Sequence, residues 1–203
     1  MDADTALARR LARDLDGAFE ALVIAHQDRL FTIAHRLLGD AHDAEEVAQD
    51  AFIRAYRALD GYPAERVRAL RLRPWLAAIV INLARNRRRR VADRHPPHPL
   101  APLIEAGLDI PDRAAARPDA RHAGAESRDE WAALLAALPA AYRAAVVLRH
   151  VDGLSYGEVA SVLGRPEGTV KAQVHRGLRL LRAALEAETA THAHHLHRTE
   201  MTA

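Results

Sequence analysis

Apolar residues recur at three- and four-residue steps through most of the chain, which is the spacing of an amphipathic helix. One such pattern starts at Asp16 and stops at Gly39, a residue type that commonly ends helices. A second runs from about Asp40 to Leu59, and a third begins at Pro74 and continues through WLAAIVINLARNRRRR. Three helices of this kind can bury a common core, so we predict a first helical domain over residues 14–91.

Two serines, each followed three positions later by a glutamate, mark further helix starts. Ser127 with Glu130, and Ser155 with Glu158, fit the capping box, in which a hydroxyl and a carboxylate satisfy the free N–H groups of a first turn. They predict helices from about residues 128 and 156, and Pro139 predicts another helix between them. We assign these helices to a second domain over residues 128–187.

The last two predicted helices have the arrangement of a helix-turn-helix. A short helix ends at Gly164, the turn GRPEG follows, and a longer helix begins near Thr169. The inner stripe of the long helix is predicted to consist of Val170, Val174, Gly177, Leu178 and Leu181. The polar or small residues of its first turns are Thr169, Lys171, Ala172, His175, Arg176 and Arg179. This pattern is typical of a helix that reads the major groove, and a generic helical hairpin with a basic outer face shares it.

Proline separates the two predicted domains. Six of the ten prolines lie between residues 92 and 127, and proline removes a helix donor and favours extended backbone before it. We therefore predict a linker over residues 92–127. Residues 188–203 lack an apolar pattern and are predicted to be a disordered tail, whose histidines have no second set of metal ligands. These histidines are His192, His194, His195 and His197.

Composition narrows the possible functions. The chain has no cysteine, no apolar run of the roughly 18 to 20 residues that a membrane span needs, and almost no β-branched runs. It also contains no phosphate-binding glycine loop, no zinc-protease motif and no persuasive pairing of nucleophile and base. We expect an all-α, cytoplasmic protein that is not an enzyme and needs neither cofactor nor metal.

Charge is distributed unevenly, although the net charge is only +2. Residues 40–50 hold five carboxylates and no Arg or Lys, whereas residues 64–94 hold ten arginines against two acids. On the third predicted helix, Asn82, Arg85, Asn86 and Arg89 share one side. Such residues form either a solvated face or a DNA-binding face, since amides bond base edges and guanidinium groups hold phosphates. The acidic block is likewise either solvated or a docking surface.

Together the two predicted domains resemble the extracytoplasmic-function group of bacterial RNA polymerase sigma factors. The first domain resembles the family in FEALVIAHQDRLFTIAHRLLGDAHDAEEVAQDAFIRAYRAL and RPWLAAIVINLARNRRRR, and the second in LPAAYRAAVVLRHVDGLSYGEVASVLGRPEGTVKAQVHRGLRLLRAAL. The segments DAEEVAQDAF and PEGTVK are the most specific part of the match. The resemblance implies a core-binding domain that reads the minus-ten element and a helix-turn-helix domain that reads the minus-thirty-five element.

The resemblance also implies partners for particular residues. The acidic helix of such factors docks on a coiled coil of the polymerase β′ subunit, which assigns that contact to Asp43, Glu46, Gln49, Asp50 and Arg54. The minus-ten element is assigned to Arg71, Arg73, Asn82, Arg85, Asn86 and Arg89. The minus-thirty-five element is assigned to Thr169, Lys171, Ala172, His175, Arg176 and Arg179. Trp75 either stacks on a base or, as is more usual in the family, packs in the core. An anti-sigma factor is a further expected partner.

The second domain departs from a common form of the family, GTVKSRLHRAR, at Ala172, Gln173, Gly177 and Leu178. The sequence preference at the minus-thirty-five element therefore does not follow from the resemblance. We expect a protein that binds core polymerase, recognises a two-part promoter and melts DNA. The alternatives are a stand-alone dimeric helix-turn-helix regulator of duplex operator DNA and a helical adaptor. The regulator would give the acidic block no function, and the adaptor would give the long basic helix none.

Overall fold

The computed structural model describes residues 3–94 and 131–200, with side chains described for residues 3–90 and 131–186. Every regular element in the described residues is helical, which confirms the predicted all-α class. The first part of the chain forms α1 (Ala3–Leu11), α2 (Leu15–Leu38), α3 (Ala41–Asp60), α4 (Ala64–Arg68) and α5 (Leu72–Arg94). Residues 131–137 are helical, and α8 (Ala140–Val146), the π-helical turn η1 (Val147–Val151), α9 (Tyr156–Leu163) and α10 (Glu167–Glu200) follow.

Capping residues set the ends of the long helices in the first part of the chain. Asp14 caps α2 by accepting a hydrogen bond from the Gly17 N–H at 3.0 Å. Gly39 ends α2 in the left-handed conformation, with φ of 78°, and Asp40 caps the start of α3. The helices α2, α3 and α5 then pack on one another through a shared apolar core, as predicted.

Two short helices were not predicted. The helix α1 precedes the predicted start of the first domain at residue 14, and it buries Leu7, Ala8 and Leu11. The helix α4 lies between the second predicted helix, which ends at about Leu59, and the third, which begins at Pro74, and it buries Val67. The helix α1 has three buried positions and α4 has one, too few to establish a helical period, and their stability comes from packing on neighbours. The helix α1 contacts α2, α4 and α5.

The helix-turn-helix forms as the sequence predicted. Ser155 and Glu158 make the complete capping box at the start of α9, and Gly164 ends α9 with φ of 63°. Four residues of the predicted inner stripe of α10 are buried: Val170, Val174, Gly177 and Leu181. The prediction for Leu178 is wrong, because it directly follows Gly177 and the 100° step of a helix turns its side chain out; it is 40% exposed.

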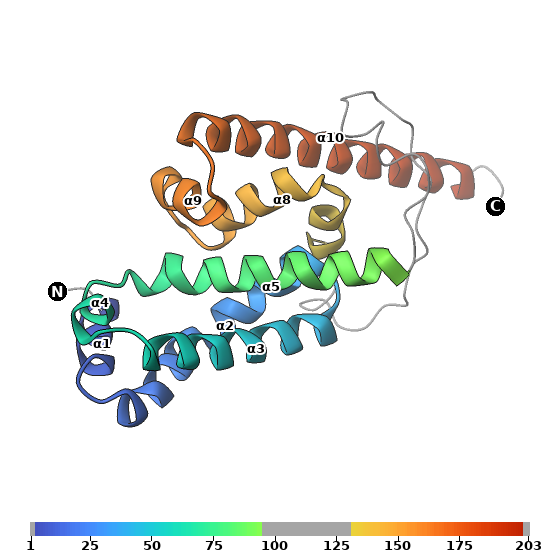
Figure 1. The fold of residues 1–203 in the computed structure, drawn as a ribbon. Coiled ribbons are helices and arrows are strands. Elements are labelled where there is room, and N and C mark those ends of the chain that lie inside the picture. Colours follow the sequence, from blue (N-terminus) through green and yellow to red (C-terminus); the bar gives the residue numbers. More distant parts are fainter. Residues whose placement is uncertain (1–2, 95–130, 201–203) are drawn as a thin grey trace.

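The two parts of the chain pack together in one body. In Figure 1, α8 and α9 lie between α5 and α10, while α2 and α3 cover the opposite side of α5. Buried residues from both parts belong to one continuous apolar core. Arg143 of α8 is buried and donates to the carbonyl oxygens of Leu37 at 2.7 Å and Leu138 at 2.9 Å, and also to that of Ala136. Because Leu37 lies near the end of α2, this arginine ties the second part to the first.

The ends of the predicted domains differ in part from the structure. The helix α5 continues to Arg94, beyond the predicted boundary at residue 91, and the rest of the predicted linker lies outside the described residues. The helix start predicted near residue 128 lies outside them as well. The tail predicted to be disordered from residue 188 is helical to Glu200, because no Gly or Pro interrupts α10 after Gly177.

Candidate nucleic-acid and partner interface

The start of α10 presents a polar face opposite its buried stripe. With 100° per residue, the stripe of Val170, Val174, Gly177 and Leu181 occupies one side of the helix. The six residues predicted to read DNA are all exposed and lie on the other side, namely Thr169, Lys171, Ala172, His175, Arg176 and Arg179. The structure therefore brings this predicted set together on one face that is open to a ligand.

A close contact between helices fixes the orientation of this face. A Cβ added at Gly177 would lie 2.7 Å from Cγ2 of Val146 and 3.4 Å from Cβ of Tyr142, so no larger residue fits without movement.

Lys171 donates to Glu167, with Nζ 2.7 Å from Oε1, and this hydrogen bond raises the pKa of Lys171. The lysine is therefore charged at neutral pH and is held on the first turn of α10.

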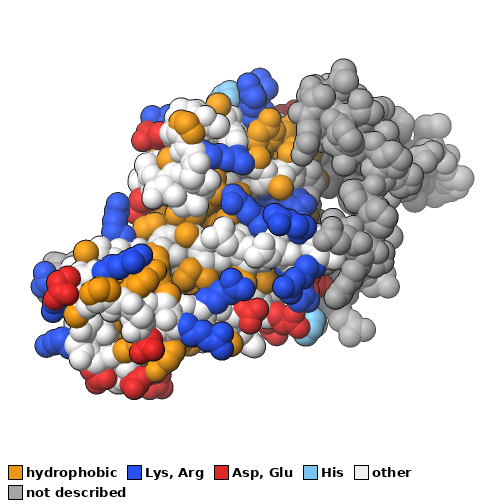
Figure 2. All heavy atoms as spheres, in the orientation of Figure 1, with side chains coloured by type: hydrophobic (Ala, Val, Ile, Leu, Met, Phe, Trp, Pro, Cys, Tyr) orange, Lys and Arg blue, Asp and Glu red, His pale blue; other side chains and the backbone are white. Residues whose placement is uncertain are grey.

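A second polar face lies along α5. Asn82, Arg85, Asn86 and Arg89 are exposed there, as predicted, and the opposite side of the helix is buried. Figure 2 shows arginine side chains along α5, next to acidic side chains of α3. Burial lowers the pKa of Arg85, and the nearby cation Arg165 lowers it further. This face combines the amide and guanidinium groups that bind bases and phosphates.

The other two residues predicted to read the minus-ten element, Arg71 and Arg73, instead contact the second part of the chain. Nη2 of Arg71 lies 2.7 Å from Oε1 of Glu158. Nη2 of Arg73 donates to the carbonyl oxygen of Asp152 at 2.5 Å. Glu158 has a lowered pKa, first because it accepts hydrogen bonds from Ser155 and then because of the nearby arginines. In this arrangement both arginines contact the second part of the chain and still keep exposed surface.

The predicted polymerase-binding residues of α3 divide into two groups. Asp43 and Glu46 form ion pairs with Arg87 of α5, whose Nε lies 2.9 Å from Oδ1 of Asp43 and whose Nη1 lies 2.6 Å from Oε2 of Glu46. The hydrogen bond to Asp43 raises the pKa of Arg87. The remaining members of the predicted polymerase-binding set, Gln49, Asp50 and Arg54, are exposed.

An apolar hollow beside these residues was missed. Ile53 is 49% exposed, and with Phe19, Phe52, Tyr56 and Arg57 it lines a hollow of about 260 Å³ between α2 and α3. The sequence contained one signal for this hollow, since Ile53 follows Gln49 by four positions and so falls on the polar side of the predicted helix. The predicted docking face is therefore partly apolar.

Three further residues that hold the two parts together were also missed. They are Arg29, Asp152 and Arg143, which form contacts between segments more than 100 residues apart. Burial and the nearby Arg88 lower the pKa of Arg143 to about 10, so it is still charged at neutral pH. No sequence pattern predicts such pairs, because a single charged residue does not recur at a regular spacing. Trp75 is half-buried and packs against the core, 6.3 Å from the ring of Tyr62.

The described residues contain neither a metal-binding cluster nor a membrane-spanning helix. Within the residues that the structure describes, no group of three His, Asp or Glu side chains is placed to hold a metal ion. The side chains of the histidine-rich tail lie outside those residues. None of the described helices combines the length and apolar character needed to cross a membrane.

Both halves of the chain match families of known proteins. Residues 22–94 match the model of Sigma-70 region 2, and residues 128–181 match that of Sigma-70, region 4. The chain is 32% identical over 173 residues to the ECF RNA polymerase sigma factor SigW of Bacillus subtilis (strain 168), covering 83% of this chain and 89% of SigW.

Solved structures show a similar fold. The structure of CnrH in complex with the cytosolic domain of CnrY matches with a TM-score of 0.66 and 27% sequence identity, covering 92% of this chain and 99% of CnrH. The sigma factor RpoE of Bartonella quintana, solved with the anti-sigma factor NepR, matches with a TM-score of 0.61 and 22% identity, covering 83% of this chain and 96% of RpoE. The second likeness concerns the fold alone.

Proposed function

The chain belongs to the extracytoplasmic-function (ECF) group of RNA polymerase sigma factors, and we propose which of its residues bind the polymerase and read promoter DNA. As a sigma factor it binds core polymerase and acts in transcription initiation. We propose that it contributes no catalysis itself, so that nucleotide addition belongs to the polymerase, and that it acts in the cytoplasm. The match of residues 22–94 to region 2 disfavours a stand-alone regulator, which has no use for that domain.

The minus-thirty-five element is assigned to α10. The observation that carries this assignment is the exposed face of Lys171, His175 and Arg176 opposite a buried stripe, on the second helix of a helix-turn-helix. The first turns of such a helix enter the major groove, where Arg and Lys bind guanine edges and hold phosphates. Ala172 carries only a methyl group, which suits an apolar contact such as the methyl group of thymine.

The minus-ten element is assigned to the face of Asn82, Arg85, Asn86 and Arg89 on α5. These four side chains are exposed while the two parts of the chain are packed together, so DNA can reach them in this arrangement. Arg71 and Arg73 belong to the same proposed surface. They are exposed as well, and DNA that binds them competes with their contacts to the second part of the chain.

Polymerase binding is assigned to α3. Gln49, Asp50 and Arg54 provide its exposed polar contacts, and the neighbouring Ile53 adds an apolar one. Asp43 and Glu46 contribute through a shared partner, Arg87, which holds both carboxylates in place. We also propose an anti-sigma factor as a partner, in keeping with the similar fold of RpoE, which was solved with one.

The test is transcription by sigma-free core polymerase, supplemented with this protein, on a library of promoters. Promoter-dependent initiation supports the proposal, and its absence with duplex binding intact would favour the stand-alone regulator. For α10, Arg176→Ala should weaken binding to the selected promoter by about 1 to 3 kcal/mol if Arg176 contacts a base edge. The matched control is Arg182→Ala, which removes an exposed arginine from a later turn of α10.

The docking assignment has a separate test. Asp50→Lys should lower the affinity for core polymerase and leave the fold intact, because Asp50 is exposed. Glu20→Lys makes the same charge change at an exposed position of α2 and should have a smaller effect. Equal core affinity for the wild type and Asp50→Lys would remove Asp50 from the docking surface.

A further inference from the structure

Lys171 is the only lysine of the chain, in which every other permanent side-chain cation is arginine. It lies on the first turns of α10, within the face assigned above to the minus-thirty-five element, and its side chain is 57% exposed. Its ammonium is a point charge on a flexible stem, whereas arginine presents a rigid fork of donors. The shape of Lys171 therefore does not fix what it contacts, and the groups that hold its ammonium do.

Glu167, one turn earlier on α10, is the first of these groups. Its Oε1 lies 2.7 Å from Nζ of Lys171, and residues four positions apart lie on the same side of a helix. The carboxylate side chain is itself 49% exposed, so a ligand that reaches the lysine also meets the acid. An ammonium group has three donors, and this ion pair uses one of them. Lys171 therefore keeps donors for DNA while Glu167 holds it.

The start of α9 confines the same ammonium. Nζ of Lys171 lies 5.6 Å from the centre of the Tyr156 ring, and the guanidinium carbon of Arg149 lies 5.0 Å from that ring centre. Both distances are within the range of cation–π attraction. A Cβ added at Gly157 would lie 3.6 Å from Oε2 of Glu167, which places the carboxylate against the first turn of α9. The ammonium of Lys171 is therefore held on the side of α10 that faces α9.

The acid changes how Lys171 can bind DNA. An unrestrained ammonium binds any phosphate within its reach, and phosphate contacts carry no sequence information. A carboxylate beside the ammonium repels phosphate and competes with it for the same positive charge. A base edge in the major groove presents neutral acceptors, which the carboxylate repels far less. Glu167 therefore lowers sequence-independent binding more than it lowers binding to a matching base.

We propose that Glu167 is a specificity-determining residue of the minus-thirty-five interface, which acts by holding Lys171 and contacts no base itself. The inference rests on the proposed function, which assigns Lys171 to that element. Glu167 is not among the residues assigned to DNA above, and its role there is to limit what Lys171 binds. The competing explanation is that an acid in the first turn of α10 only stabilises the helix through its dipole.

The experiment measures binding of the full chain to two fluorescently labelled duplexes over a range of salt concentrations. One duplex is selected by the wild-type chain from a random library, and the other is a scrambled sequence of the same composition. Glu167→Gln keeps the shape of the side chain and removes its charge. The ratio of the two affinities should fall about threefold, mainly because the scrambled duplex binds more tightly. The slope of log affinity against log salt for that duplex should steepen by about 0.9, the value for one added phosphate contact.

Two further variants isolate the role of Lys171. In the Lys171→Ala background, Glu167→Gln should leave the affinity ratio unchanged, because no ammonium is left to hold. Glu186→Gln makes the same charge change at an exposed position on a later turn of α10, and it should leave the ratio and the salt slope as in the wild type. All three positions are exposed, so every variant should melt near the wild-type temperature.

The outcomes separate this inference from the proposed function. An equal affinity ratio for the wild type and Glu167→Gln would overturn the inference, and a lower melting temperature of that variant would then assign Glu167 to the helix dipole. A fall in the ratio that persists in the Lys171→Ala background would also overturn it, since Glu167 would then act on DNA directly. If Lys171→Ala binds the selected duplex as tightly as the wild type, the assignment of Lys171 fails and the inference fails with it.

Discussion

Arg29 of α2 and Asp152, which follows η1, form a two-point ion pair across 123 residues of sequence. Nη2 of Arg29 lies 2.6 Å from Oδ2 of Asp152, and Nε of Arg29 donates to Oδ1. The Asp152 side chain has no exposed surface, and Arg73 donates to its backbone carbonyl oxygen. One buried carboxylate therefore joins the two DNA-reading parts of the chain.

Asp152→Asn should lower the free energy of unfolding by about 3 kcal/mol, because removing one partner of a buried pair leaves the other charge without compensation. Urea denaturation measures this loss. Asp50→Asn makes the same chemical change at an exposed position and should alter stability by less than about 0.5 kcal/mol. Equal stabilities for the two variants would show that the Asp152 pair does not hold the packed arrangement.

Gly177→Ala adds a methyl group that would meet Val146 at 2.7 Å, and such overpacking costs about 1 to 3 kcal/mol. Ala normally brings a gain of about 1 kcal/mol to a helix interior, so the net loss of stability should be up to about 2 kcal/mol. Gly168→Ala is the control, since nothing lies within 4 Å of the added Cβ there. Thermal melting compares the two variants. The melting temperature of Gly177→Ala should fall, and that of Gly168→Ala should rise or stay unchanged. Adding Val146→Ala to Gly177→Ala should restore part of the lost stability.

His26 predicts a pH dependence of stability. It is buried on α2, and burial lowers its pKa below the usual 6.5, against the opposing effect of Asp4. As the pH falls, His26 is protonated near pH 6.5 in the unfolded chain and only at lower pH in the folded chain. Stability from this residue is complete above pH 6.5 and falls as the pH drops toward the folded pKa.

The measurement for His26 is the free energy of unfolding at several pH values between 7.5 and 5.5. His26→Leu should show a shallower decline over this range than the wild type, because it removes the proton uptake of the unfolded chain. Parallel profiles for the two proteins would contradict the assignment.

Ser155→Ala should cost about 1 kcal/mol, because the Ser155 hydroxyl accepts the Glu158 N–H in the capping box of α9. Ser161→Ala, at an exposed position inside the same helix, should be neutral or slightly stabilising, since Ala is the better helix former. Chemical denaturation compares the two. A smaller loss for Ser155→Ala than for Ser161→Ala would be incompatible with the cap.

Sequence reasoning succeeded where a signal was local. Gly39 and Gly164 ended their helices, and the capping box started α9, because each acts within a few residues of the backbone it satisfies. The buried stripe of α10 followed from helical period, with an error at Leu178 that came from extending the stripe by one 100° step. The exposed faces of α5 and α10 were predicted by the same reasoning.

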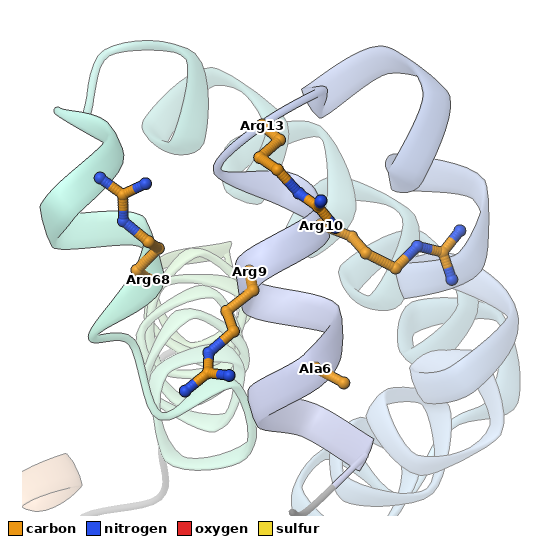
Figure 3. Close-up of a pocket in the computed structure, with 5 residues that line it drawn as sticks. All are labelled: Ala6, Arg9, Arg10, Arg13 and Arg68. Carbon is orange, nitrogen blue, oxygen red and sulfur yellow. The ribbon is translucent and has the colours of Figure 1, made fainter.

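Sequence reasoning failed where partners are distant. The contacts of Arg71 with Glu158 and of Arg73 with Asp152 join residues about 80 or more positions apart. Charged residues that do not recur at a regular spacing give no indication of which distant residue they contact. The same holds for the hollow between α1 and α4, since neither helix was predicted; it is lined by Ala6, Arg9, Arg10, Arg13 and Arg68 (Figure 3). Both helices are short enough that packing, rather than their own sequence, decides whether they form.

The contact between Arg71 and Glu158 has a consequence for competition among partners. Both residues belong to one chain, so diluting the protein does not separate them. A ligand that needs Arg71 must outcompete this internal acid at any protein concentration. Promoter DNA and Glu158 therefore compete for the guanidinium group of Arg71. Added salt screens both electrostatic interactions.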